Sequence, residues 1–148
     1  DYDRDGFSDI ATVNANAPLL RIYRNRIPDH LQAHGKSGNF IAVQLHGSNT
    51  GTQPSGDRSN RDAIGAVVQL DLGDRKLTRH LSCGEGFAAI NSKTILFGLG
   101  SSNRAESLEV VWPSGKTTNF TSGLEAGTLI VVDETTSSIS TAPYLAPR

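Results

Sequence analysis

The first nine residues carry four carboxylates at short intervals. Aspartates stand at positions 1, 3, 5 and 9, and a glycine stands at position 6. Carboxylates this close repel one another strongly unless a cation lies between them. Calcium takes six to eight oxygen ligands from carboxylates, backbone carbonyls and water. The spacing therefore predicts a calcium site, and the alternative is an acidic turn without an ion. The predicted ligands are Asp1, Asp3, Asp5, the Phe7 carbonyl and Asp9.

The residues after the loop indicate which kind of calcium site this is. An EF-hand needs a glutamate at position twelve and a helix behind the loop. Thr12 occupies that position, and Ile10 to Val13 has an extended pattern, so we expect a loop that leads into a strand. Magnesium fits less well because it demands a tight octahedron. Since Asp1 opens the chain, we expect weak affinity, in the range of about 10⁻⁴ to 10⁻³ M.

Two short apolar stretches follow the loop and predict a hairpin. They cover Phe7 to Val13 and Leu19 to Tyr23, and residues 14–18 between them have turn composition. An isolated two-stranded hairpin is marginal in water, so we expect this piece to belong to a larger sheet. Residues 1–25 then form one unit. Residues 26–38 are predicted to be a linker with a short helical segment from Asp29 to His34.

From residue 39 onward, short strand patterns alternate with turn residues. Their number and spacing predict an all-β fold, an antiparallel sandwich or barrel that spans residues 39–134. The polar loop at 48–57 is predicted to be mobile, and the tail at 135–148, rich in Ser, Thr and Pro, is predicted to be disordered. The seven predicted strands are Phe40–Leu45, Ile64–Leu72, Lys76–Ser82, Thr94–Phe97, Leu108–Trp112, Lys116–Phe120 and Thr128–Val132.

Composition limits the classes of partner. The 148 residues include 14 basic and 15 acidic side chains, and no basic stripe points to nucleic acid. No apolar run approaches the roughly 20 residues of a membrane-spanning helix, so we expect no membrane insertion. The single cysteine, Cys83, cannot form an internal disulfide. We expect it to be a small buried side chain, and we expect Trp112 to lie in the core.

Two groups of motifs resemble known families. Residues 1–25 resemble the FG-GAP (VCBS) propeller repeat through the DxDxDGxxD loop and the later segment Leu20 to Asn25. The remainder resembles the ASPIC/UnbV domain, which commonly follows such repeats. The matching segments are Ser59–Ala66, Gly84–Phe87, Asn91–Ser92, Phe97–Gly100 and Trp112–Gly115.

The resemblance implies a function as well as a fold. This layout occurs in cartilage acidic protein-like proteins and in bacterial secreted or surface proteins, so it implies an extracellular, cell-surface or periplasmic location. It implies an adhesion-like or ligand-binding role, and no catalytic residues carry over. The expected partners are a protein or a carbohydrate, together with the preceding propeller of the parent chain. The stretch from Gly47 to Arg58 looks longer than the family's usual connection.

Candidate ligand contacts follow from the segment at Ser59. Asn60, Arg61 and Asp62 offer polar groups at a turn, and the alternative is that an ion pair of Arg61 holds that turn. Nucleophile and phosphate-binding motifs are missing from the sequence, so we do not expect an enzyme. We expect a binding module, with a structural cap of the propeller as the second hypothesis. A hydrolase is the third, with Glu85, Glu106 and Glu109 as its only candidate acids.

Overall fold

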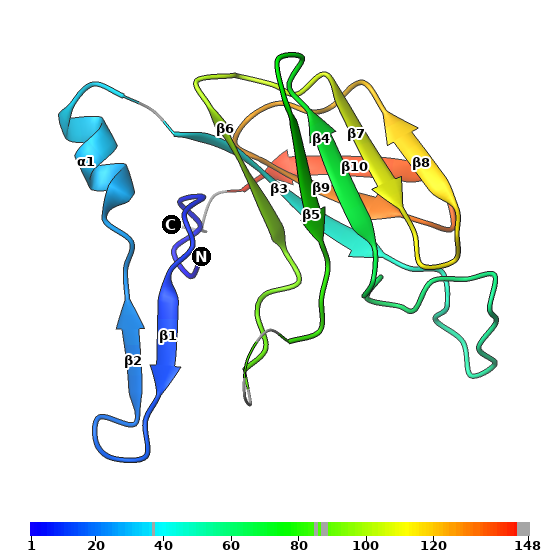
Figure 1. Ribbon diagram of the computed structural model, residues 1–148, viewed down its shortest axis with the longest axis horizontal. Coiled ribbons are helices and arrows are strands. Elements are labelled where there is room, and N and C mark those ends of the chain that lie inside the picture. Colours follow the sequence, from blue (N-terminus) through cyan, green and yellow to red (C-terminus); the bar gives the residue numbers. More distant parts are fainter. Residues whose placement is uncertain (37, 85, 87–88, 145–148) are drawn as a thin grey trace.

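The computed structural model describes residues 1–36, 38–84, 86 and 89–144, which form ten strands and one short helix (Figure 1). The strands are β1 (Ile10–Val13), β2 (Leu20–Tyr23), β3 (Asn39–His46), β4 (Val67–Asp71), β5 (Lys76–His80), β6 (Ile95–Gly100), β7 (Ser107–Val111), β8 (Thr117–Phe120), β9 (Thr128–Asp133) and β10 (Ser138–Pro143). The helix, α1, spans Ile27–Ala33.

Eight of the strands form a β-sandwich. One sheet has the order β10-β9-β3-β6 and the other has the order β5-β4-β7-β8. Every neighbouring pair is antiparallel except β3 and β9, which run parallel. Within the described residues the two sheets stay separate and do not close into a barrel. Of the two predicted architectures, the sandwich is therefore the one that forms, with one parallel pair that the prediction did not contain.

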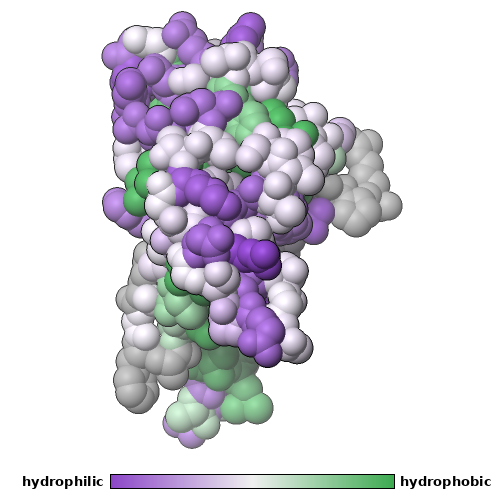
Figure 2. Space-filling model, turned by 90° about the vertical axis from the view of Figure 1, so that its right-hand side faces the viewer, coloured by the Kyte–Doolittle hydropathy of each residue, from purple (hydrophilic) through white to green (hydrophobic). Residues whose placement is uncertain are grey.

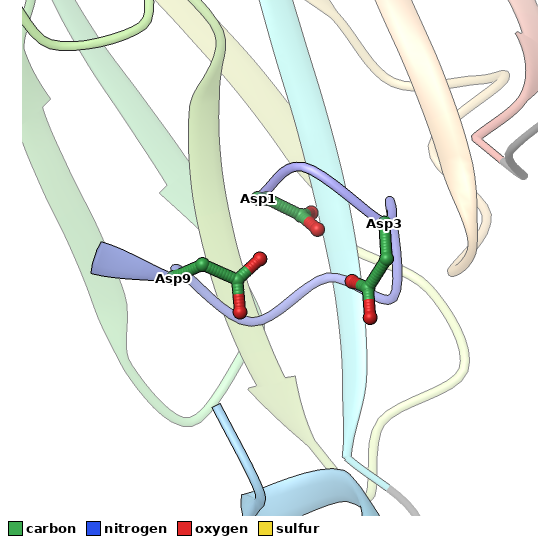
Figure 3. A group of neighbouring side chains, drawn as sticks. All are labelled: Asp1, Asp3 and Asp9. Carbon is green, nitrogen blue, oxygen red and sulfur yellow. The ribbon is translucent and has the colours of Figure 1, made fainter. Parts of the chain in front are cut away.

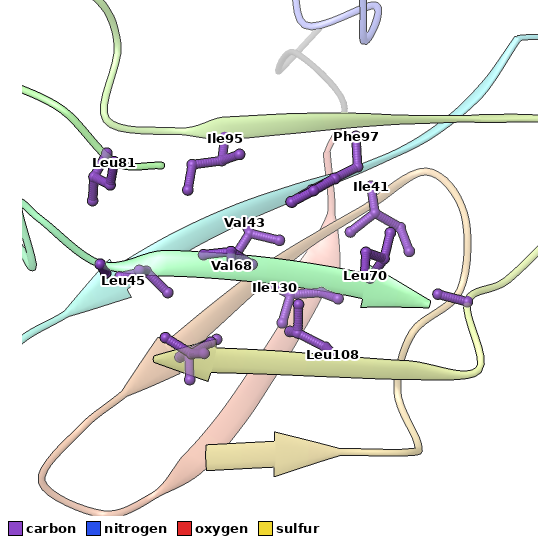
Figure 4. Close-up of a cluster of buried hydrophobic side chains, with 14 of the residues drawn as sticks. Ile41, Val43, Leu45, Val68, Leu70, Leu81, Ile95, Phe97, Leu108 and Ile130 are labelled. Carbon is purple, nitrogen blue, oxygen red and sulfur yellow. The ribbon is translucent and has the colours of Figure 1, made fainter. Parts of the chain in front are cut away.

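The core lies between the two sheets (Figure 4). Alternate residues of each strand point inward, as the period of two requires. Val68 and Leu70 of β4 and Ile130 and Val132 of β9 are fully buried in this way. Fully burying an aliphatic side chain of this size is worth about 1.5–3 kcal/mol, so this alternating pattern is the main source of the sandwich's stability.

All seven strands predicted between residues 39 and 134 are confirmed as β3 to β9. The prediction of a disordered tail is wrong for residues 138–144. Ser138 to Pro143 form β10, which pairs with the whole of β9. Tyr144 is buried, and its ring packs edge-on against Phe40 at 5.6 Å between centroids. An edge strand that is exposed on one face needs few apolar residues. The polar composition of residues 138–143 therefore gave no strand pattern from which β10 could be predicted.

The N-terminal segment forms the predicted hairpin, in which β1 pairs with β2 and with no other strand that the structure describes. Its apolar side chains are solvent-exposed, up to 87% at Val13. In the face shown in Figure 2, hydrophobic residues gather mainly toward the lower end, at the height of the hairpin in Figure 1, while the upper part is mostly hydrophilic or intermediate. The predicted linker contains α1, which begins two residues before the expected Asp29, with Pro28 in its first turn.

Two single-residue expectations have opposite outcomes. Trp112 is buried in the core, as predicted, and its indole nitrogen donates to the Thr118 hydroxyl at 3.0 Å. Cys83 is exposed, so the expectation of a buried thiol is wrong. The physical reason is that β5 ends at His80, which leaves Cys83 beyond the sheet. No helix within the described residues is long and apolar enough to cross a bilayer.

We predict that Tyr144→Ala destabilises the sandwich by about 2 kcal/mol, because it removes a buried ring at the end of β10. Tyr23→Ala is the matched control, since Tyr23 is half exposed on the hairpin, and its effect is expected to stay within about 0.5 kcal/mol. Urea unfolding followed by Trp112 fluorescence measures both. Equal effects of the two substitutions would show that the tail does not contribute to the folded unit.

Candidate functional site

The acidic loop brings three of its four aspartates together. One carboxylate oxygen from each of Asp1, Asp3 and Asp9 lies within 4.8 Å of the others. Figure 3 shows these side chains directed into the space that the loop encloses. Asp5 is not part of this group of oxygens. The spacing of the sequence thus gathers a triad of hard oxygen donors, with Asp5 beside it.

Backbone N–H groups hold two members of the triad in place. The Asp1 carboxylate accepts from the N–H groups of Asp5 and Gly6, both at 3.0 Å. The Asp9 carboxylate accepts from Asn25 at 2.7 Å and from Tyr2 at 3.0 Å. The hydrogen bond from the Asn25 N–H is the main reason that the pKa of Asp9 is lowered. These bonds orient the side chains before any ligand binds.

The remaining two aspartates have unsatisfied oxygens. The Oδ1 atom of Asp3 and the Oδ2 atom of Asp5 are buried and have no hydrogen-bond partner in the part of the chain that the structure describes. Arg24 supplies the nearby positive charge, since its guanidinium lies 2.8 Å from Asp3 Oδ2 and 3.7 Å from Asp5 Oδ2. The hydrogen bond to Asp3 is the first cause of the raised pKa of Arg24. A buried acceptor without a partner is costly. A cation bound at this position would satisfy these two oxygens and would therefore stabilise the loop.

The loop sits directly on the sandwich. Gly6 has a φ of 89°, and a Cβ atom at this position would lie 2.0 Å from the Phe40 ring. The Arg4 guanidinium carbon lies 5.9 Å from the centre of the Tyr144 ring. Glycine at position 6 therefore serves two purposes: it turns the loop, and it lets the loop backbone approach the β3 side chain.

The donor set fits calcium better than a softer metal. All four aspartates offer oxygen, and two of these oxygens are buried without partners. A carboxylate oxygen that already accepts one N–H bond retains a lone pair for a cation, so Asp1 and Asp9 remain available as ligands. Oxygen-only sets suit calcium, magnesium or manganese rather than zinc or copper. The Phe7 carbonyl remains a predicted ligand.

A second polar cluster, which was not among the predicted sites, lies at the end of β3, where the Glu134 N–H donates to the His46 carbonyl. Glu134 follows β9 and is only 3% exposed. Its carboxylate accepts N–H bonds from Ser48 at 2.8 Å and from Ser59 at 3.1 Å, and a hydroxyl bond from Ser59 at 2.9 Å. The hydroxyls of Ser48 and Ser114 also donate to it. We call Glu134, Ser48, Ser59 and Ser114 the polar pin.

The pKa of Glu134 reflects this arrangement. Burial by itself raises that pKa, but the hydrogen bonds from Ser114, Ser48 and Ser59 outweigh burial and lower it to about 2. The carboxylate is therefore ionised at neutral pH and acts only as an acceptor. A signal for this residue does exist in the sequence. Glu134 is in phase with Ile130 and Val132, so it occupies an inward-facing position of the β9 pattern.

The predicted ligand contacts at residues 60–62 are engaged with the protein itself. Asn60 closes a turn by donating to the Ile64 carbonyl at 2.8 Å and accepting from the Ile64 N–H at 2.9 Å. Arg61 pairs with Asp62 at 3.1 Å, and Lys93 also pairs with Asp62. The hydrogen bond from Arg61, followed by that from Lys93, lowers the pKa of Asp62 to about 2. These contacts fit the ion-pair alternative, while ligand contact by Asn60, Arg61 and Asp62 stays a prediction.

The candidate acids of a hydrolase lie in different settings. Glu85 lies outside the described residues. Glu106 is exposed just before β7, and Glu109 is a half-buried residue of β7 that pairs across to β4. In the polar pin, Ser59 is buried and Ser48 and Ser114 are half-buried, and the hydroxyls of all three donate to Glu134.

The fold and these two clusters define a β-sandwich module with an acidic loop seated on one of its faces. The family model described as ASPIC and UnbV matches residues 56–139, more than half of the 148 residues. The chain therefore belongs to the ASPIC and UnbV family. The match includes Ser59, Ser114 and Glu134, so three of the four pin residues lie within the family domain. No curated protein matches the chain.

We predict that Glu134→Gln lowers the free energy of unfolding by about 3 kcal/mol at pH 7, because it weakens hydrogen bonds to a buried charge. Glu125→Gln removes an exposed carboxylate and is the control, expected within about 0.5 kcal/mol of wild type. Urea unfolding measures both.

We also predict that the stability difference between wild type and Glu134→Gln depends on pH. The folded-state pKa of Glu134 is about 2, below the value of 4.5 for an unperturbed glutamate. Its contribution is thus complete above pH 4.5 and is lost as the pH falls toward 2. The stability difference between wild type and Glu134→Gln should shrink over that interval. A stability difference that stays constant from pH 6 to pH 2.5 would contradict an ionised Glu134 carboxylate in the folded protein.

Proposed function

We propose that this chain is a non-catalytic, calcium-dependent binding module of an extracytoplasmic protein. Its first 25 residues are the end of an FG-GAP-type propeller repeat, and the ligand of the module is a carbohydrate or a protein. The observation that carries the proposal is the convergence of Asp1, Asp3 and Asp9 around a loop in which buried oxygens lack partners. Membership of the ASPIC and UnbV family supports a module without catalytic residues of its own.

Arg24 determines how tightly such a loop would hold calcium. Its side chain already neutralises part of the charge on Asp3 and Asp5. A second cation at the same loop must tolerate this guanidinium or displace it toward Asp29, which Arg24 also contacts at 3.2 Å. Weak binding of about 10⁻⁴ to 10⁻³ M follows, which is the range of extracellular calcium modules.

A second candidate function is a structural cap of the preceding propeller. One observation favours it, namely that the β1–β2 hairpin exposes apolar side chains on strands that have no further neighbour among the described residues. An exposed apolar hairpin with open edges is a site where another sheet would pair. A cap would bury this surface against the propeller and would need no ligand. The two functions are compatible in one chain, but only the first requires calcium to affect a binding surface.

The calcium proposal is tested by isothermal calorimetry and by amide chemical shifts of residues 3–9. Wild type should respond with a dissociation constant of about 10⁻⁴ to 10⁻³ M, and Asp3→Asn should weaken binding at least about tenfold because a ligand charge is lost. Asp74→Asn is the control, since this exposed aspartate pairs only with Arg75 in a surface turn. No response of wild type at 10 mM calcium would reject the proposal.

Arg24→Gln separates a metal site from an acidic turn that arginine alone neutralises. If calcium binds at the loop, removal of the competing charge should strengthen binding by about 1 kcal/mol, a factor of about five. If the loop is only an ion-pair cluster, the substitution should lower stability and leave calcium without effect. Calorimetry gives the affinity, and urea unfolding in the presence and absence of calcium gives the stability.

A further inference from the structure

An open cleft of about 580 Å³ lies between the acidic loop and the sandwich. The loop forms one wall, and the end of β5 with the segment leading into β6 forms the other. Tyr144, after β10, also lines it. This volume is in the range of clefts that bind small ligands, about 300–1,000 Å³. The cleft joins residues from the two ends of the chain and its middle, so it exists only when the loop is seated.

The two walls carry different chemistry. The sandwich wall is formed by Arg79, with His80 and Asn91 beside it. The loop wall presents Asp9, whose two carboxylate oxygens accept backbone N–H bonds, and the exposed ring of Tyr2. The loop wall thus carries the carboxylates of Asp1 and Asp9 beside the Tyr2 ring. With calcium bound at the loop, as proposed above, the cation would offset these carboxylates, and a ligand would meet the Arg79 guanidinium on the opposite wall.

Two contacts orient the exposed side chain of Arg79. Its guanidinium carbon lies 5.9 Å from the centre of the Phe97 ring, across the gap between β5 and β6. One of its N–H groups donates to the Thr78 carbonyl at 3.0 Å. Because guanidinium carries five N–H donors in a planar fork, the side chain retains the geometry for a paired contact with a carboxylate.

We propose that this cleft binds an acidic saccharide, with the sugar carboxylate on Arg79 and the ring against Tyr2. The inference rests on the proposed function, since an ordered loop supplies one wall. Three features favour a saccharide: the concave shape, the neutral hydroxyl and amide side chains, and aromatic rings with an apolar face and a polar edge. The Arg79 guanidinium favours a sugar that carries a carboxylate over a neutral one.

The test uses the whole chain with 10 mM calcium and two probes, a tetrasaccharide of galacturonic acid and a neutral tetrasaccharide of galactose. Binding is followed by amide chemical shifts and by calorimetry. We expect the acidic probe to bind at least tenfold more tightly than the neutral one and to shift residues 79–82 and 91–96. Arg79→Gln should lose at least tenfold in affinity. Arg58→Gln removes the same charge from the exposed loop before Ser59 and should change affinity less than twofold.

Each outcome decides the inference. Failure of the acidic probe to bind, equal binding of both probes, or an equal effect of the two arginine substitutions would overturn it, as would shifts confined to another surface. A parallel calcium titration on the same sample keeps the two proposals distinct. If calcium binds and the acidic saccharide does not, the saccharide inference fails and the calcium module stands. If the saccharide binds through Arg79 and calcium does not bind, the calcium proposal fails alone.

Discussion

The hydrogen bonds around Glu134 are the constraint on which one end of this structure depends. A carboxylate at an inward-facing position of β9 would be strongly destabilising without partners. Three serines from separate segments supply them: Ser48 from the loop after β3, Ser59 from the segment before β4, and Ser114 from the turn between β7 and β8. Since the carboxylate is satisfied only when all three segments are present, one charge fixes two positions of the connection between β3 and β4 and the turn between β7 and β8.

Further hydrogen bonds and close backbone contacts join the segments that carry the serine partners of Glu134. The Ser114 N–H donates to the Ser59 hydroxyl at 3.2 Å, so two pin residues are also bonded to each other. Gly47 approaches the Asn60 carbonyl so closely that a Cβ atom there would lie 1.9 Å from the oxygen. The segment at 47–49 and the segment at 59–61 thus lie side by side through backbone bonds. The family segments around Ser59 and Ser114 therefore have a structural explanation that requires no ligand.

The acidic loop depends on the sandwich in a different way. The loop has few apolar side chains to bury, and it is held by backbone N–H groups on Asp1 and Asp9 and by the close approach of Gly6 to Phe40. Tyr144 from the last strand covers the same region. This seating brings a cluster of aspartates within reach of β5 and β6, and it creates the cleft that contains Arg79. The order of the loop and the shape of the cleft are therefore coupled.

Much of the fold was predictable because alternation of apolar residues directly reports which face of a strand is buried. Val68 with Leu70, and Ile130 with Val132, show this in the sequence itself. The pattern does not report pairing, so the parallel contact between β3 and β9 could not be foreseen. Strand β10 was missed because its exposed face is polar, and Glu134 was missed because a charged residue at an inward position resembles the end of a strand. The aspartate loop was visible in the sequence, whereas its counter-charge, Arg24, follows β2 and reaches the loop only because β2 pairs back along β1.

A crystal structure grown in calcium, with anomalous difference density measured at a wavelength where calcium scatters, tests the account most directly. We predict a peak at 2.3–2.6 Å from oxygens of Asp1, Asp3 and Asp9, with Arg24 turned away from Asp3 and toward Asp29. Absence of a peak, with the bond from Arg24 to Asp3 unchanged at about 2.8 Å, would contradict a calcium module and leave the loop as an ion-pair cluster.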